Sequence, residues 1–146
     1  MSIYPIRGGS AMWPVQQAIF SVLSADAALQ QMANGIYDGE VPQEEDVRMP
    51  YVVIGDTTEL GRDLLAVSGR EVSQIVNVYS NYQGAKEAKL IMDRVISLLD
   101  RRESSLNVPG WDIHHVQLEF NEILQEPDSI RHAIVRFRIR VQKRAA

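Results

Sequence analysis

The sequence of 146 residues contains no cysteine. This absence excludes disulfides, thiolate metal sites and cysteine nucleophiles, and it does not discriminate between compartments. No apolar run approaches the roughly 20 residues needed to span a bilayer, so no membrane role is expected. Residues 1–7 also lack the long apolar stretch of a secretory signal, which makes cytoplasmic synthesis the expectation.

Catalytic and cofactor-binding patterns are also missing. Gly8, Gly9 and Gly61 form no phosphate-binding loop, and there is no Gly-x-Ser-x-Gly elbow. His114 and His115 are neighbours in an expected strand and point to opposite faces, and His132 lies far from both. A metal site within one chain is therefore not expected, although one shared between chains stays open. We therefore expect that the protein is not an enzyme and that it binds no cofactor and no metal.

The composition is that of an ordinary globular protein, with 45% hydrophobic and 23% charged residues. The length fits a single domain spanning residues 1–146, of which residues 1–12 are expected to form a flexible arm. The net charge of −4 argues against a dedicated or specific nucleic-acid binder, because such proteins carry a basic surface.

The most regular pattern lies near the C-terminus, where apolar residues alternate with three arginines. Because side chains of a strand alternate between its faces, the pattern predicts a strand with one dry face and one cationic face. The dry face holds Val135, Phe137, Ile139 and Val141. The cationic face holds Arg136, Arg138 and Arg140, which we call the guanidinium ladder.

Residues 113–124 are interpreted as the antiparallel partner of this strand, and residues 126–129 supply the turn. On the dry face, Phe120 is predicted to oppose Val135, Leu118 to oppose Phe137, and Val116 to oppose Ile139. On the cationic face, Glu119 meets Arg136, Gln117 meets Arg138, and His115 meets Arg140. A slip of one residue would place arginines in the core, so the register is well specified.

Two helices are expected elsewhere. The first starts near Pro14, and Asp26 is expected to cap a short helical segment that follows it. Ser80 and Gln83 fit a capping box that would start the second helix. The buried stripes predicted for the two helices are Val15, Ile19, Val22 and Leu23 in the first, and Ala88, Ile91, Met92, Val95, Leu98 and Leu99 in the second.

Two further strands are expected, at residues 51–55, with a continuation to Thr58 left open, and at residues 72–80. Ile36-Tyr37 is a candidate for a short extended piece. The order helix, strand, strand, helix, strand, strand predicts an α+β fold with an antiparallel-rich sheet of about four strands. Both helices would pack on the dry face of this sheet. The cationic face would then lack a covering layer within one chain.

Two loops have more than one interpretation. The acidic loop, residues 38–50, lacks the spacing of a calcium-binding loop, so a solvated loop is the simpler reading. In a ring it could instead face the lumen, where like charge would keep passing DNA from sticking. The loop at residues 59–70 carries Leu60, Leu64, Leu65 and Val67, which could dock on a neighbouring chain or cover their own.

The guanidinium ladder also has competing interpretations. It could be a contact surface for other subunits, or a solvated sheet face with cross-strand pairs to Glu119 and its neighbours. Exposed ion pairs contribute only about 0–1 kcal/mol each, so stability alone explains three arginines poorly. The negative net charge of the chain disfavours a contact of the ladder with DNA.

Several short blocks resemble a known family in their order along the chain. They are Ile36-Tyr37, Val41-Pro42, residues 50–55, Val78-Tyr79-Ser80, Gly84, Glu87-Ala88 and His132. This set resembles the phage tail completion family, which is related to the Bacillus phage tail-to-head joining protein. The resemblance covers roughly residues 30 to 142, and none of its motifs is catalytic.

The resemblance implies a small α+β domain like that of the lambda tail terminator, assembled as a hexameric ring at the top of the tail tube. It implies a structural role in the virion, at the head-proximal end of a tail that is built in the bacterial cytoplasm. The implied partners are sister copies, the tail tube protein and the head-tail connector protein. For the interface we predict Arg136, Arg138, Arg140, Glu119, Leu64 and Leu65.

The alternative function is a small ligand-binding module or enzyme on a ferredoxin-like sheet. Such a site needs converging polar groups in a pocket, and the sequence offers no set of residues that would form one.

Overall fold

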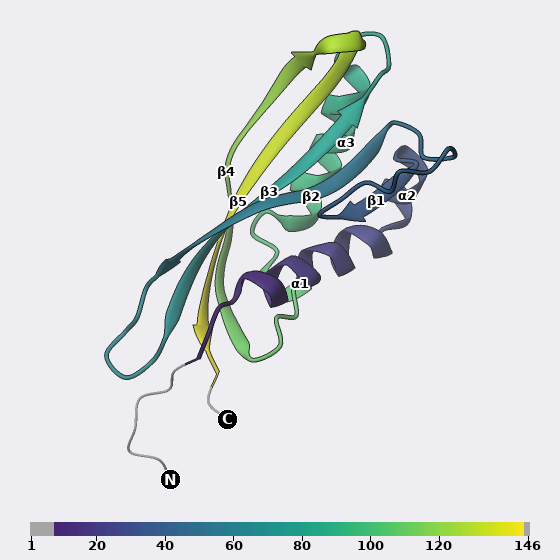
Figure 1. The fold of residues 1–146 in the computed structure, drawn as a ribbon. Helices are drawn as coiled ribbons and strands as arrows, with labels where there is room; N and C mark the ends of the chain where they lie inside the picture. Colours follow the sequence, from purple (N-terminus) through teal and green to yellow (C-terminus); the bar gives the residue numbers. More distant parts are fainter. Residues whose placement is uncertain (1–7, 145–146) are drawn as a thin grey trace.

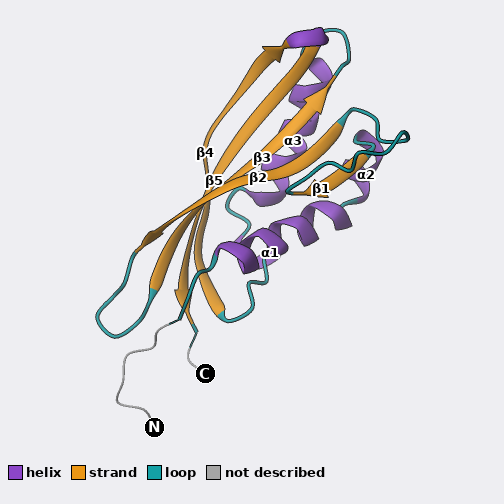
Figure 2. Ribbon diagram, viewed as in Figure 1, coloured by secondary structure: helices purple, strands orange, loops and turns teal. Residues whose placement is uncertain are grey.

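The computed structural model describes residues 8–144 as three helices and one five-stranded sheet (Figures 1 and 2). In chain order the elements are α1 (Met12–Ala25), α2 (Ala27–Met32), β1 (Gly35–Asp38), β2 (Tyr51–Gly61), β3 (Gly69–Ser80), α3 (Lys86–Leu99), β4 (Trp111–Glu126) and β5 (Ile130–Lys143), with short 3₁₀ turns at Glu103–Ser105 and Pro127–Ser129. Of the predicted N-terminal arm, residues 1–7 lie outside the described part, Ala11 is buried, and Met12 begins α1.

The strand order across the sheet is β1-β2-β3-β5-β4. The predicted α+β fold with an antiparallel-rich sheet is confirmed, because every neighbouring pair except β1 and β2 is antiparallel. The short extended piece indicated at Ile36-Tyr37 is β1, which is only four residues long and was not predicted to join the sheet parallel to β2. Four residues are too few to show a periodic pattern.

The helices lie against one face of the strongly twisted sheet (Figure 1), and the hydrophobic core lies between the two layers. Val15, Ile19 and Leu23 of α1 and Ile91, Val95 and Leu99 of α3 are buried there. On β5 the inward residues are Val135, Phe137, Ile139 and Val141, all at most 1% exposed. The predicted dry face of this strand is confirmed.

The predicted register of the β4–β5 hairpin is confirmed for four pairs: Leu118–Phe137, Val116–Ile139, Gln117–Arg138 and His115–Arg140. The predicted pair Phe120–Val135 is wrong. A bulge between Leu118 and Phe120 shifts the register, so Phe120 opposes Arg136 and its ring lies on the cationic face. An extra residue at a bulge reverses the alternation beyond it.

The predicted loop at residues 59–70 is shortened at both ends, since β2 continues to Gly61 and β3 begins at Gly69, and residues 62–68 form the loop that remains. A bulge between Ile54 and Thr57 reverses the alternation of β2 and hides its second half from a period-2 pattern. The buried side chain of Gln74 holds this bulge: its amide donates to the Gly55 carbonyl at 2.8 Å and accepts from the Thr57 hydroxyl at 2.9 Å.

The two predicted helix caps have different outcomes. The Asp26 carboxylate accepts from the Leu29 N–H at 2.9 Å, as expected of the cap of α2. The capping box at Ser80 is wrong, because α3 begins later, at Lys86. The Ser80 hydroxyl instead donates to the Glu87 carboxylate at 2.7 Å and accepts from the Tyr82 N–H at 3.2 Å.

Candidate assembly interface

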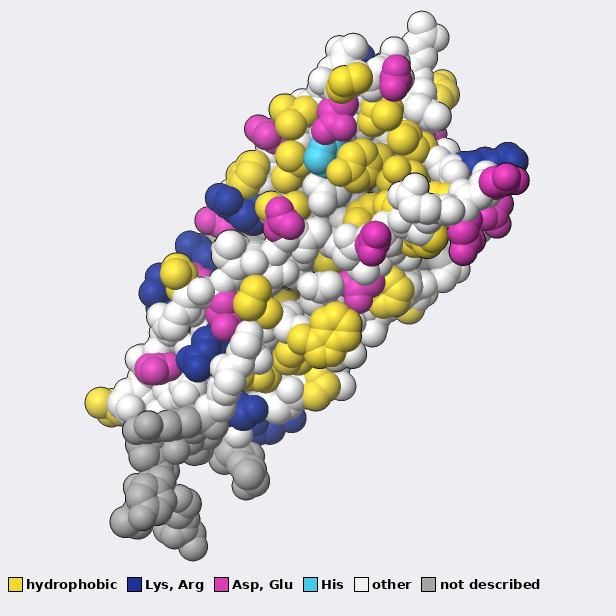
Figure 3. Space-filling view, viewed as in Figure 1, with side chains coloured by type: hydrophobic (Ala, Val, Ile, Leu, Met, Phe, Trp, Pro, Cys, Tyr) yellow, Lys and Arg dark blue, Asp and Glu magenta, His cyan; other side chains and the backbone are white. Residues whose placement is uncertain are grey.

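The guanidinium ladder lies on the face of β5 that is opposite to the core. Its residues oppose Ile75, Ser73 and Glu71 of β3, in the order Arg136, Arg138, Arg140. Within residues 8–144 no helix lies on this side (Figure 1), and in Figure 3 arginine and lysine side chains are interleaved with acidic ones along the left margin of the molecule. The β5 backbone therefore separates a fully buried row of side chains from a row that reaches solvent.

Arg136 is the most constrained member of the ladder. Its Nε lies 3.2 Å from Oε2 of Glu119, and its guanidinium lies over the Phe120 ring at 4.4 Å. The Nε atom is buried and makes no hydrogen bond, so Glu119 acts on it as a nearby charge. The structure therefore brings together two of the predicted interface residues, Arg136 and Glu119, and the bulge adds Phe120 beneath them.

Arg138 and Arg140 are held less firmly. The Arg138 guanidinium donates to the Gln117 side-chain oxygen at 3.2 Å, and its Nε lies 3.7 Å from Glu71. Glu71 is shared with Arg62, at 3.1 Å. Arg140 is exposed and, within residues 8–144, forms no ion pair. The pairing of the guanidinium groups with carboxylates thus weakens along β5 from Arg136 to Arg140.

Beside Arg140 the surface is hollowed. The hollow has a volume of about 250 Å³, and its lining includes Arg62, Leu64, His114 and Arg140. The His114 ring bonds to the Gln142 side chain through Nε2, at 3.0 Å. Guanidinium and imidazole groups around one depression form a surface that suits a carboxylate.

Leu64 and Leu65 lie at the tip of the β2–β3 hairpin, which extends past the helices at the lower left of Figure 2. Leu64 is 55% exposed, and Leu65 is fully exposed with a positive φ of 42°. A bridge between Leu64 and Val67 closes the tip. These leucines do not join the core of their own chain, so the hairpin presents them away from it.

A row of aromatic side chains lies on the same sheet face as the guanidinium ladder, and the sequence did not predict it. Tyr37, Tyr51, Tyr79 and His132 contact one another in this order, with ring centroids 5.8, 5.5 and 4.3 Å apart. Partial burial raises the pKa of Tyr51 and of Tyr79 above the ordinary value of 10.0. Tyr79 pairs with Tyr51 and with His132 across neighbouring strands, so the signal was available, but it required the β1–β2–β3–β5 order.

His132 ends this aromatic row. Its Nδ1 lies 2.7 Å from a Glu126 carboxylate oxygen, and its Nε2 lies 2.7 Å from the Asn77 side-chain oxygen. Across residues 8–144, no three His, Cys, Asp or Glu side chains are grouped so that they could hold a metal ion.

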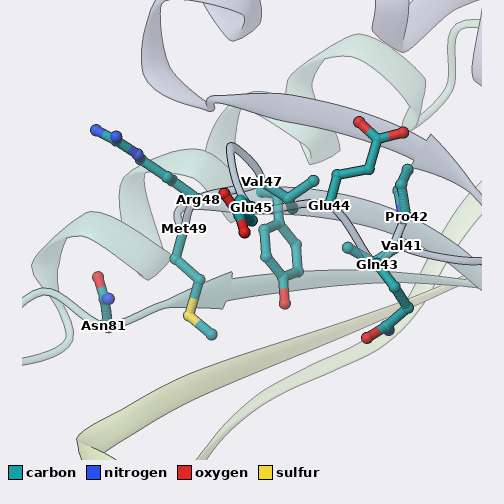
Figure 4. A pocket seen from close by; sticks show the side chains of 10 residues that line it. Val41, Pro42, Gln43, Glu44, Glu45, Val47, Arg48, Met49 and Asn81 are labelled. Atoms are coloured by element: carbon teal, nitrogen blue, oxygen red, sulfur yellow. The ribbon is translucent and has the colours of Figure 1, made fainter.

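The acidic loop follows β1 at one edge of the sheet and stands over a hollow of about 690 Å³ (Figure 4). Val41, Glu44, Met49, Tyr51 and Asn81 contribute to the lining. Glu44 and Arg48 point in different directions in Figure 4. In the described part of the chain, no ion pair involves the carboxylates of residues 40–46.

Two solved structures share this fold. A chain from the virion of a native gene transfer agent particle matches with a TM-score of 0.82 and 20% identity, covering 92% of this chain and 99% of its own. The gp17 protein of bacteriophage SPP1 matches with a TM-score of 0.56 and 21% identity, covering 90% of this chain and 95% of its own. At these identities the likeness establishes the fold. No curated protein matches the sequence.

The sequence itself identifies the family. The model of the family described as tail completion protein gp17 matches residues 17–142, which is most of the chain. The chain belongs to this family, and its role is a structural one in completing a phage tail. None of the helices described in residues 8–144 is long and apolar enough to cross a membrane.

Proposed function

We propose that this protein closes the head-proximal end of a phage tail tube as a hexameric ring and joins the tube to the head connector. The observation that carries the proposal is the match to the tail completion family over residues 17–142. The uncovered cationic face of the sheet supports it, because a surface of this kind is available to sister copies. In this proposal the 146 residues act as one domain, without a cofactor and without catalysis.

The mechanism is geometric. Contacts between two different surfaces of identical subunits form closed rings when the rotation between neighbours allows it. One face of the ring would copy the contact that tail tube subunits offer to one another. The other face would not bind further tube subunits and would bind the connector instead. Tail length is then limited by binding alone.

The tip of the β2–β3 hairpin supports a contact beyond the chain itself. Leu64 and Leu65 are exposed, and the two strands of the hairpin hold them clear of the core. We propose that they dock on a sister copy or on the tail tube. The double variant Leu64→Ser/Leu65→Ser should keep its unfolding midpoint and lose affinity for tubes in a pull-down. Unchanged binding to tubes would exclude the tip from the interface.

Deletion of the gene in the parent phage, followed by electron microscopy of lysates, tests the proposal. The expected result is unjoined heads together with tails of abnormal length. Purified protein added to such a lysate should restore joining, and its mass on tubes should be that of a hexamer. Tails of normal length attached to heads in the deletion mutant would contradict the proposal.

A further inference from the structure

The net charge of the chain lies in one short segment. The acidic loop holds five of the 19 Asp and Glu residues and one of the 15 Lys and Arg residues, so it carries −4, and the rest of the chain has 14 of each sign. The acidic residues are Asp38, Glu40, Glu44, Glu45 and Asp46. Of these, the last four are exposed.

The opposite charge collects on the other side of the molecule. Around the guanidinium ladder, Arg62, Arg136, Arg138 and Arg140 are accompanied by only two carboxylates, from Glu71 and Glu119, among the contacts described for residues 8–144. The ladder is on β5, whereas the acidic loop joins β1 to β2, and β3 lies between β2 and β5. In Figure 3 acidic groups gather at the right margin beside one basic group, whereas along the left margin basic and acidic groups are interleaved.

Two complementary surfaces on opposite sides of one subunit suit a heterologous contact, in which each copy offers one surface to each neighbour. We propose that the acidic loop of one copy places its carboxylates on the guanidinium ladder of the next copy, with one carboxylate in the hollow between Arg62, His114 and Arg140. This inference rests on the proposed ring and identifies the two surfaces that close it.

The receiving surface is suited to this occupant. Arg140 has no ion-pair partner within the described residues, and the hollow beside it offers donors from Arg62 and His114. Charge-assisted hydrogen bonds of guanidinium to carboxylate are among the stronger polar contacts. The donating surface is suited as well, because Glu40, Glu44, Glu45 and Asp46 are exposed and form no ion pair within residues 8–144.

Charge reversal on each side tests the proposal with one set of full-length proteins. In Arg138→Glu/Arg140→Glu both surfaces become acidic, and in Glu44→Lys/Glu45→Lys/Asp46→Lys both become basic. Each variant alone should self-associate about 100-fold less than the original protein, because like charges would face each other across the contact. An equimolar mixture should assemble again, since every contact between unlike variants is then attractive, and only rings with an even number of subunits should form.

A matched reversal on the outer side of α3, Lys89→Glu/Asp93→Lys, should leave self-association unchanged. Native mass spectrometry and sedimentation velocity measure the original protein, the two surface variants, their mixture and the control, and circular dichroism confirms that each is folded. The proposal is overturned if the single-surface variants assemble normally, or if the mixture fails to restore assembly. Normal assembly of all variants would favour the acidic loop facing the lumen.

Cysteine cross-linking supplies a second measurement that also detects a weak contact between free copies. Because the chain contains no cysteine, Glu45→Cys and Arg140→Cys introduce the only thiols. A mixture of these two variants should yield a disulfide-linked heterodimer under mild oxidation, whereas Glu45→Cys mixed with Lys89→Cys should not. Equal yields in both mixtures would overturn the proposal.

The proposed function and the proposed pair of contact surfaces can be contradicted separately. If the original protein forms rings and caps tubes while the cross-link is absent, only the assignment of the two surfaces is wrong. If the original protein neither forms rings nor caps tubes, the proposed function is wrong.

Discussion

The two faces of β5 come from alternating residues of one segment, and their surroundings are opposite. Phe137 and Ile139 are fully buried beneath the helices, whereas the Arg136 and Arg138 side chains are 39% and 42% exposed. The dry face is complete within one chain. The cationic face has more guanidinium groups than carboxylates. Folding of one copy therefore leaves part of the positive charge on this face unpaired.

The largest expected effect is on the dry face. Phe137→Ala removes a fully buried ring from the centre of the core and should lower the free energy of unfolding by about 3–5 kcal/mol. Arg138→Ala, one residue away on the other face, should change it by about 1 kcal/mol or less. Urea unfolding of both variants measures the difference, and equal losses would contradict the separation of the two faces.

Gln74 is a polar exception on the dry face, and its replacement should have an intermediate effect. Gln74→Leu leaves the Gly55 carbonyl without this donor, so the free energy of unfolding should fall by about 1–3 kcal/mol. Thr57→Val removes only the hydroxyl that donates to Gln74 and should cost less. Thermal unfolding compares the two. No loss in Gln74→Leu would mean that the bulge in β2 forms without the amide.

Asp26 caps α2 and also binds Arg94 of α3. It accepts from the Leu29 N–H and from the guanidinium of Arg94, at 2.9 and 2.6 Å, and this guanidinium lowers the pKa of Asp26 below 3.8. Asp26→Ala should cost about 1 kcal/mol through the lost cap.

Asp26→Asn retains a cap and removes the ion pair, so it isolates the dependence on pH. Because the pKa is lowered in the folded state, the advantage of the original protein over Asp26→Asn is present above pH 3.8. It should disappear as the pH falls through the folded-state value. Urea unfolding at a series of pH values measures this difference. A difference that stays constant down to pH 2 would contradict the role of the ion pair.

The same comparison shows what a sequence can predict. Strict alternation predicted β5, its two faces and four cross-strand pairs, because a one-residue slip would bury arginine. The helical stripes were predicted in a similar way, from apolar residues that recur at helical spacing. These features depend on patterns that repeat over many residues.

The features that the sequence did not predict are local interruptions of those patterns. The bulges near Gly55 and Glu119 shift the alternation by one residue, and no residue type in the sequence marks them. Because of them, the loop predicted before Arg70 is longer than the observed one, and Phe120 was predicted on the wrong face of β4. The aromatic row from Tyr37 to His132 depends on strand order, which was not known from periodicity.

The central claim is that the guanidinium ladder serves contact between copies rather than the fold of one copy. The double variant Arg138→Gln/Arg140→Gln tests it most directly, with unfolding and the capping of tail tubes measured on the same preparation. The free energy of unfolding should change by about 1 kcal/mol or less, while capping, counted by electron microscopy, should be lost. A variant that caps tubes normally, or one that unfolds as readily as Phe137→Ala, would contradict the claim.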